Sequence, residues 1–237
     1  MQKIAIIPAR GGSKRIPDKN IRDFCGKPLI AYSIQAALKA DLFDKVIVST
    51  DSEKVANVAL GHGAEVPFIR PAELSDDYTG TSAVVVHAIQ ECQRMGLSPE
   101  LVCCIYATAP LIQQQYLQRG FKALRTQAEK HYAFSVTEFA FPVQRALIQS
   151  DNGGIQPMFP EYIGKRSQDL PVALHDAGQF YWGRSEAFLA SKKVFAPHSV
   201  PIILPHYLVQ DIDTLDDWQR AELLYRAYYQ HSSEDKK

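Results

Sequence analysis

The stretch from residue 4 to residue 20, IAIIPARGGSKRIPDKN, restricts most strongly what this chain can fold into. It opens with a short apolar run, residues 4–7, whose length and β-branched content predict a buried strand. Pro8 ends this run because proline has no amide hydrogen to donate to a neighbouring strand. Gly11 and Gly12 follow, and they let the backbone turn and approach a ligand closely. The stretch therefore predicts a strand that leads into a tightly turning loop.

The loop after this strand is basic. It carries four cations, Arg10, Lys14, Arg15 and Lys19, and one acid, Asp18, so its local charge is +3 on a chain whose formal net charge is zero. A cationic loop that exposes backbone amides after a buried strand suits a polyphosphate. A solvated basic surface loop is the alternative interpretation. The Walker spacing and the dinucleotide fingerprint are both absent, so a phosphate would be bound by another arrangement.

Composition narrows the class of protein. A length of 237 residues fits one compact domain over residues 1–237, with room for an insertion. No apolar run approaches the roughly 20 residues that span a bilayer, and the N-terminus lacks the features of a signal peptide. The neutral charge argues against a nucleic-acid partner. The four cysteines show no C-x-x-C spacing, which predicts reduced structural thiols and a cytoplasmic location, and the neighbours Cys103 and Cys104 should point to opposite faces of a sheet.

Apolar runs alternate with helical patterns along the chain, which predicts an α/β fold with a mostly parallel sheet. The expected strands are residues 4–7, 45–50, 65–69, 101–106, 132–137, 178–182 and 199–204. The expected helices are residues 28–40, 52–60, 83–94, 113–127, 185–189 and 218–229, followed by a frayed tail from residue 231. Prolines and paired glycines interrupt the pattern between residues 139 and 173, where we expect inserted hairpins.

Ligands of open parallel sheets bind at the carboxyl ends of the strands. The segments expected at that edge are the basic loop and residues 49–52, 70–82, 106–111, 175–180 and 210–213. Read together, these segments resemble the cytidylyltransferases that activate sialic-acid-type sugars. Residues 8–20 and 26–30 match their signature IPARGGSKxIPxKN…GKPLI, residues 70–82 match RPAEL…D…T…S, and residues 211–214 match DIDT.

Other stretches place the resemblance nearer to one branch of that family. CCIYATAPL, FSVTEFAFPVQRAL and RSQDLPVALHDAGQFYWG look closer to the branch that activates pseudaminic acid. Where the N-acetylneuraminate enzymes have Q-P-T-S-P, this chain has residues 106–110, YATAP; where they have N-G-A-I-Y, it has residues 177–181, AGQFY. Both loops belong to the sugar side in that family, so these departures count against N-acetylneuraminate as the substrate.

The resemblance implies a Rossmann-like fold of the nucleotide-diphospho-sugar transferase type and a definite reaction. CTP and pseudaminic acid, a nine-carbon 2-keto sugar acid, would give the CMP-sugar and pyrophosphate with Mg²⁺ as cofactor, for use in flagellin or other cell-surface glycosylation. N-acetylneuraminate or 3-deoxy-octulosonate cytidylyltransferase is the alternative among enzymes. A non-catalytic nucleotide-binding regulatory module is the alternative from another class. The resemblance also implies a homodimer whose insertion lends residues to the partner's sugar site.

The resemblance assigns residues to each half of the site. Those expected to bind CTP are Ala9, Arg10, Gly11, Ser13, Lys14, Lys19, Asn20 and Arg70. Those expected on the sugar side are Tyr106, Thr108, Arg166, His175 and Gln179, although His175 fits a structural histidine as well. Arg10 and Lys19 are expected to be catalytic. A guanidinium fork suits a phosphate on which charge develops, and Lys19 matches a lysine of the family's phosphate site.

The acidic cluster near the C-terminus predicts two different roles. Asp211 and Asp213 are two residues apart, so both carboxylates face the same side of an extended backbone. One or two carboxylates plus substrate phosphates commonly hold Mg²⁺, and we therefore expect this pair to be catalytic metal ligands. Thr214 stands three residues before Asp217, which predicts a capping box at the start of the last helix.

Overall fold

A six-stranded sheet with strand order β10-β6-β9-β5-β1-β4 is the centre of the structure. The computed structural model describes residues 1–234 of the chain. The strands of this sheet are β1 (Gln2–Pro8), β4 (Lys45–Ser49), β5 (Pro99–Ile105), β6 (Tyr132–Glu138), β9 (Leu174–Arg184) and β10 (Ser199–Ile203). Strand β9 is antiparallel to both neighbours, and the other neighbouring pairs are parallel. The expected α/β fold with a mostly parallel sheet is confirmed.

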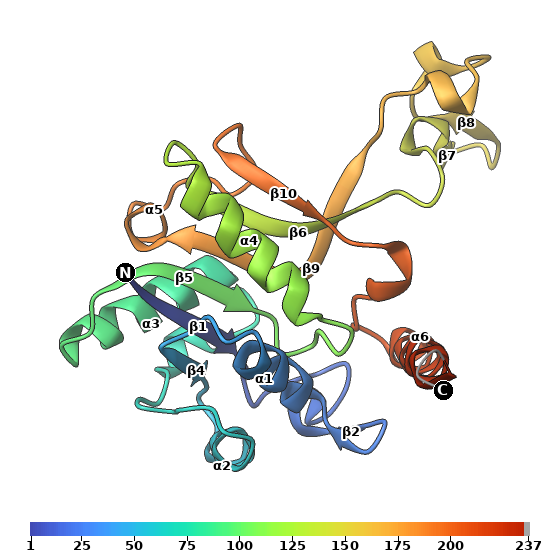
Figure 1. The fold of residues 1–237 in the computed structure, drawn as a ribbon. Coiled ribbons are helices and arrows are strands. Elements are labelled where there is room, and N and C mark those ends of the chain that lie inside the picture. The colour runs from blue at the N-terminus through green and yellow to red at the C-terminus, as the bar shows by residue number, and fades with distance from the viewer. Residues whose placement is uncertain (235–237) are drawn as a thin grey trace.

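Helices cover both faces of this sheet (Figure 1). They are α1 (Leu29–Lys39), α2 (Glu53–Gly61), α3 (Thr81–Arg94), α4 (Gln114–Thr126), α5 (Ser185–Leu189) and α6 (Leu215–Glu234). One core cluster joins α1, α2 and α4 to the sheet, and a second joins α3 and α5 to its other face. Successive strand residues alternate between them: Ile7 and Cys103 lie in the first cluster, Ile6 and Cys104 in the second. The opposite orientation predicted for the two cysteines is confirmed.

Most expected boundaries lie within two residues of the observed ones, and three expectations are wrong by more. Residues 65–69 form only two isolated bridges, Ile47 to Glu65 and Thr50 to Ile69, since Pro67 removes a donor from the middle of the segment. Strand β9 begins at Leu174, not at residue 178. Helix α6 begins at Leu215 and continues to Glu234, so the expected tail is helical in its first part. The rest of that tail, residues 235–237, lies outside the described residues.

The direction of β9 brings an additional segment to the edge where the parallel strands end. Ile105, the last residue of β5, lies opposite Phe180, and the amide of Tyr106 donates to the carbonyl of Gln179 at 2.9 Å. Because β9 is antiparallel, the segment before Phe180 lies beside the carboxyl ends of its neighbours. Thr137 near the end of β6 lies opposite His175. Residues 175–179 therefore reach the expected edge from the amino-terminal part of a strand, although the sequence pattern places them after one.

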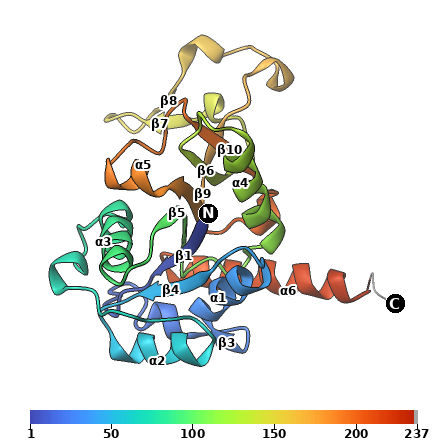
Figure 2. The same ribbon diagram turned by 60° about the vertical axis from the view of Figure 1, so that its left-hand side comes forward.

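The segment between β6 and β9 extends away from the sheet, as Figure 1 and Figure 2 both show. It contains the hairpin β7 (Leu147–Gln149) and β8 (Ile155–Pro157), which pair antiparallel, and several short 3-10 turns. The expected insertion of hairpins is confirmed. Within the described part of the chain, no helix has both the length and the hydropathy that crossing a membrane requires.

Candidate active site

Side chains hold the basic loop in place by hydrogen bonds to its backbone. The Asn20 side-chain amide donates to the carbonyl of Arg10 at 2.9 Å, and the amide of Gly11 donates to the Asp51 carboxylate at 2.9 Å. A Cβ at position 11 would lie 2.7 Å from the Cβ of Ser52, so only glycine lets the loop approach the start of α2 this closely. The loop is therefore packed tightly in a fixed position at the ends of β1 and β4.

A third, smaller core connects the basic loop to the C-terminal segment. Ile16 of the loop is fully buried with Phe24, Ile212 and Trp218, and the rings of Phe24 and Trp218 pack edge to face at 5.4 Å. Phe24 belongs to the small hairpin of β2 (Asp23–Phe24) and β3 (Lys27–Pro28). This apolar packing places residues about 200 positions apart next to each other, and so sets the acidic cluster beside the basic loop.

Two carboxylates pair with the four cations of the loop. Asp77 forms ion pairs with Arg10, at 2.7 Å, and with Lys14, while Asp213 pairs with Arg15 at 3.1 Å and with Lys19 at 3.4 Å. The contacts from Lys14 and Arg10 hold the pKa of the Asp77 carboxyl below its usual value. The loop thus lies between the carboxylates of Asp77 and Asp213. A phosphate ligand would have to replace these carboxylates as the partner of some of the cations.

Arg70 is the most enclosed cation of the site. Its side chain is 3% exposed and lies 3.7 Å from the Asp51 carboxylate, and its Nε donates to Ser75 at 3.0 Å. Burial lowers the pKa of the Arg70 guanidinium from its ordinary value. A buried and doubly contacted guanidinium is a fixed donor, which suits recognition of a base or ribose edge.

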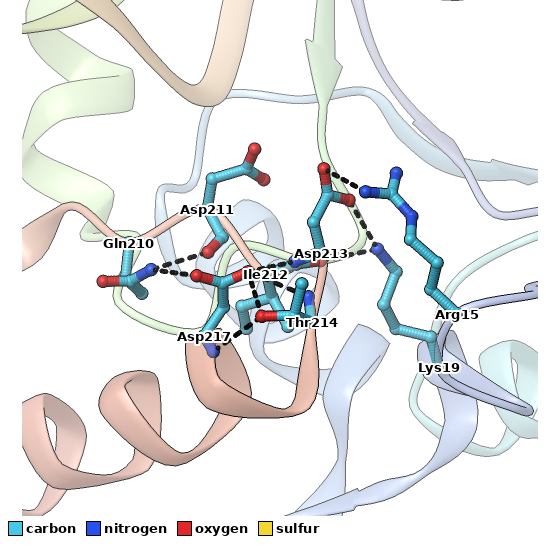
Figure 3. A network of polar contacts seen from close by, with 8 residues as sticks. All are labelled: Arg15, Lys19, Gln210, Asp211, Ile212, Asp213, Thr214 and Asp217. Atoms are coloured by element: carbon cyan, nitrogen blue, oxygen red, sulfur yellow. Dashed lines mark hydrogen bonds and ion pairs between the residues drawn. The ribbon is translucent and has the colours of Figure 1, made fainter. Parts of the chain in front are cut away.

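Figure 3 shows the acidic cluster and its neighbours. The side chain of Ile212 is buried, so Asp211 and Asp213 on either side of it both face the cavity. Burial, and then the neighbouring Asp213, raise the pKa of the Asp211 carboxyl. Lys19 bridges to this segment by donating to the Ile212 carbonyl at 2.6 Å. The two carboxylates therefore share one cavity, on either side of the buried Ile212.

Asp217 has a separate, structural role. Its carboxylate accepts from the amide of Thr214 at 2.8 Å, and the Thr214 hydroxyl accepts from the amide of Asp217 at 3.2 Å. These reciprocal bonds satisfy free amides at the start of α6. The Thr214 hydroxyl also donates to the Asp217 carboxylate at 2.8 Å, and this bond, followed by the bond from the Thr214 amide, lowers the pKa of that carboxyl. The predicted capping box is confirmed.

The cations of the basic loop and their partners Asp77 and Asp213 line a cavity of about 640 Å³, which we call the nucleotide cavity. The expected site residues that line it are Arg10, Ser13, Lys14, Lys19, Asn20, Arg70, Tyr106, Thr108, Asp211 and Asp213. Ala9, at 1% exposure, and Gly11, which has no side chain, do not line it. Most residues expected to bind CTP therefore surround one concave space.

A second cavity of about 540 Å³, which we call the distal cavity, adjoins the first at Tyr106 and Asp211. His175 lines it. Gln179 does not, because its side chain is buried and donates to the Leu208 carbonyl. Arg166 lies in the insertion and lines neither cavity. The expected sugar residues are therefore only partly brought together within one chain.

Several cavity residues were not expected from the sequence. Asp77, Thr81, His206 and Arg220 line one or the other cavity, and the Thr81 hydroxyl lies 3.4 Å from the hydroxyl of Tyr106. Asp77 falls within the matched RPAEL block, so its position alone was a signal. Thr81 falls within the same expected segment, residues 70–82. No local pattern marks His206 and Arg220, because what they share is their position in space.

Comparison with known proteins gives consistent relatives. A sequence model of the cytidylyltransferase family matches residues 4–152. The chain is 46% identical over 230 residues to pseudaminic acid cytidylyltransferase of Campylobacter jejuni, covering 97% of this chain and 99% of that protein. It is 30% identical to N-acylneuraminate cytidylyltransferase of Escherichia coli, covering 92% of this chain and 51% of that protein. Among solved structures, CMP:2-keto-3-deoxy-manno-octonic acid synthetase complexed with CTP has a TM-score of 0.70 at 15% identity, covering 96% of this chain and all of that one.

Proposed function

The chain belongs to the cytidylyltransferase family, and on that basis we propose that it transfers CMP from CTP to the anomeric hydroxyl of pseudaminic acid. The observation that carries the choice of sugar is the 46% identity to pseudaminic acid cytidylyltransferase over nearly the whole chain, against 30% and 33% to two N-acylneuraminate cytidylyltransferases. The match extends through the insertion and β9, where the expected sugar residues lie. N-acetylneuraminate and 3-deoxy-octulosonate are the alternative substrates.

We assign the nucleotide cavity to CTP. Arg10, Lys14 and Lys19 would bind the triphosphate, with Ser13 and the backbone at Ala9 and Gly11 donating further hydrogen bonds. The positions of the three cations in one cavity support this assignment. Asn20 and Arg70 would contact the ribose or the cytosine, for which the fixed geometry of Arg70 is suited.

The proposed reaction is a direct displacement at the α-phosphorus. The anomeric oxygen forms a bond to that phosphorus while the bond to the oxygen bridging the α- and β-phosphates breaks, and pyrophosphate leaves with the electron pair. Charge therefore increases on the pyrophosphate in the transition state, and Arg10 and Lys19 would stabilise it there. His175 is a candidate to accept the proton of the anomeric hydroxyl.

The acidic pair fits Mg²⁺. Asp211 and Asp213 offer hard oxygen donors, and both line the nucleotide cavity. No group of three or more His, Cys, Asp or Glu residues able to hold a metal occurs within residues 1–234, so further ligands would come from the triphosphate and water, as is common for Mg²⁺. When bound, the ion would neutralise phosphate charge and orient the attacking hydroxyl.

We further propose a homodimer formed through residues 139–173. Phe141 is 83% exposed and Ile155 is 72% exposed in the single chain, and such apolar surface usually marks an interface. A partner's insertion would also supply Arg166 to the sugar site, next to Tyr106, Thr108, His175 and the loop held by Gln179.

All four cysteines are free thiols, which supports a cytoplasmic location.

Pyrophosphate release tests the proposed function. The purified protein is mixed with CTP, Mg²⁺ and, in parallel, pseudaminic acid, N-acetylneuraminate or 3-deoxy-octulosonate, and the product is identified by mass spectrometry. We expect CMP-pseudaminic acid and a kcat/KM at least about tenfold above the other sugars, a difference of roughly 1.4 kcal/mol. Faster turnover of another sugar acid would overturn the substrate assignment. CTP binding without turnover of any sugar would indicate the regulatory module.

A further inference from the structure

Six Arg and Lys side chains line the nucleotide and distal cavities, and they differ in how their charge is compensated. Five of them line the nucleotide cavity, and each forms an ion pair with Asp51, Asp77 or Asp213. The sixth, Arg220, lines the distal cavity and forms no ion pair or side-chain hydrogen bond with the residues described here. Its charge acts on the Asp217 carboxyl from a distance, but no carboxylate oxygen lies within ion-pair distance of it among the described residues. A guanidinium with no close partner in a concave polar surface is a ready site for an anion.

The position of Arg220 on α6 is well defined. It lies one helical turn after Asp217, whose bonds with Thr214 fix the start of that helix. Trp218, in the same part of α6, is buried in the small core beneath the basic loop. A side chain carried by a capped and packed helix is positioned more precisely than one carried by a loop.

The triphosphate is not the anion expected in the distal cavity. Cations for the phosphates lie on the nucleotide side of Asp211, and the distal cavity begins beyond that carboxylate. In a 2-keto sugar acid, the carboxylate is bonded to the anomeric carbon, so it must lie close to the reacting hydroxyl. That hydroxyl must in turn face the α-phosphorus at the boundary of the two cavities.

We propose that Arg220 binds the carboxylate of the sugar acid, in an assignment that rests on the proposed function. The guanidinium fork matches a carboxylate with two parallel hydrogen bonds, and this contact would fix the orientation of the adjacent anomeric hydroxyl. The substrate carboxylate also needs such a partner because Asp211 and Asp176 line the same cavity and repel it. His175 and His206 line it too, but an imidazole ring lacks the guanidinium's fork of parallel N–H donors.

Kinetics of Arg220→Gln and Arg220→Lys test this proposal. We expect Arg220→Gln to raise the KM for the sugar acid roughly 10- to 100-fold, the range for losing a hydrogen bond to a charged group, while the KM for CTP stays within about twofold. Arg220→Lys keeps the charge but loses the fork, so its KM for the sugar acid should lie between those of the wild type and Arg220→Gln. Arg226→Gln is the matched control, since it removes an exposed arginine of the same helix that pairs instead with Glu222 at 3.3 Å.

A neutral analogue separates carboxylate binding from a structural role. The methyl ester of the sugar acid should be a much poorer substrate than the acid for the wild type, and the two should become nearly equivalent for Arg220→Gln. An unchanged KM for the sugar acid, an equal rise in both KM values, or an undiminished preference for the acid would overturn the proposal. The test uses whichever sugar acid the wild type converts, so a wrong choice of sugar would contradict only the proposed function.

Discussion

The basic loop and the insertion differ in how completely one chain surrounds them. In the basic loop, Ile16 is fully buried, and all four cations are paired with Asp77 or Asp213. In the insertion, apolar side chains face outward, among them Ile163 at 66% and Val172 at 73% exposure. The loop is therefore packed and paired within one chain, whereas the insertion leaves apolar surface exposed.

This difference shows which half of the site a single chain can build. The nucleotide cavity is lined by most of the residues expected to bind CTP, whereas Arg166 of the sugar set lies away from both cavities. We infer that CTP binding is a property of the protomer and that full sugar binding is a property of the dimer. The following predictions test that inference, starting from the largest expected effect.

Asp211→Asn should have the largest effect on turnover. Removing one of the two carboxylates proposed to hold Mg²⁺ should lower kcat by at least roughly 1000-fold, the upper range for loss of a single transition-state contact. The fold should not suffer. A carboxyl whose pKa is raised in the folded state costs stability at pH values above its unfolded pKa, so this variant should melt at the same or a higher temperature at pH 7.

An Mg²⁺ titration of activity beside thermal melting checks this prediction. Asp216→Asn is the control, because Asp216 carries the same charge in the first turn of α6 and lines neither cavity. A fully active Asp211→Asn enzyme at ordinary Mg²⁺ concentrations would remove this carboxylate from the proposed metal site.

Arg10→Ala should have the second largest effect. Its guanidinium would meet charge that increases on the leaving pyrophosphate, so kcat should fall on the order of 100-fold, with a smaller change in CTP affinity. Single-turnover kinetics and CTP titration separate the two quantities. Lys39→Ala, in the last turn of α1, is the control. A rise in the KM for CTP alone would make Arg10 a contact that binds substrate and transition state equally.

Charges placed on the insertion should break the proposed dimer and raise the KM for the sugar acid more than the KM for CTP. Phe141→Glu together with Ile155→Glu would bury two unpaired charges in the proposed interface, and should weaken self-association roughly 100-fold or more. Analytical ultracentrifugation measures the association. Leu60→Glu, at an exposed apolar position of α2, is the control. A wild type that sediments as a fully active monomer would exclude the dimer.

Asp217→Asn should have the smallest effect. It weakens the capping box of α6 and should cost about 0.5 to 1 kcal/mol of stability with activity largely kept. Because the pKa of Asp217 is lowered in the fold, its contribution is present above the unfolded pKa and is lost as the pH falls through the folded pKa. The melting difference between wild type and variant should therefore shrink at acid pH. Loss of activity in this variant would mean that the two roles in the acidic cluster are assigned wrongly.

The sequence predicts well what depends on neighbouring residues. The strand before the basic loop, the alternation of Cys103 and Cys104, and the capping box at Thr214 all follow from local patterns, and the structure confirms them. The relation between the basic loop and the DIDT segment follows from the family resemblance. Its physical basis, the burial of Ile16 against Trp218, becomes visible only in three dimensions.

What depends on distant parts of the chain could not be predicted. Asp77 pairs with a cation 67 positions away, and no pattern around it specifies that partner. The direction of β9 depends on which strands flank it, so its amino-terminal part was assigned to the wrong kind of segment. The sequence does not identify Arg220 as a cavity residue, because helical periodicity does not reveal which turn of α6 faces a cavity. The proposed division of the site between protomers lies equally outside what one sequence pattern can show, since it concerns a second chain.

Mixed dimers test the division of the site most directly. Arg10→Ala damages the part assigned to a protomer's own nucleotide cavity, and Arg166→Ala damages the part assigned to its partner. Each variant alone should be nearly inactive with CTP and the sugar acid. Mixed in equal amounts and allowed to exchange subunits, they should regain about a quarter of wild-type activity, because half of the dimers are mixed and each contains one intact composite site. Activity that stays at the level of the separate variants after exchange would contradict a sugar site shared between protomers.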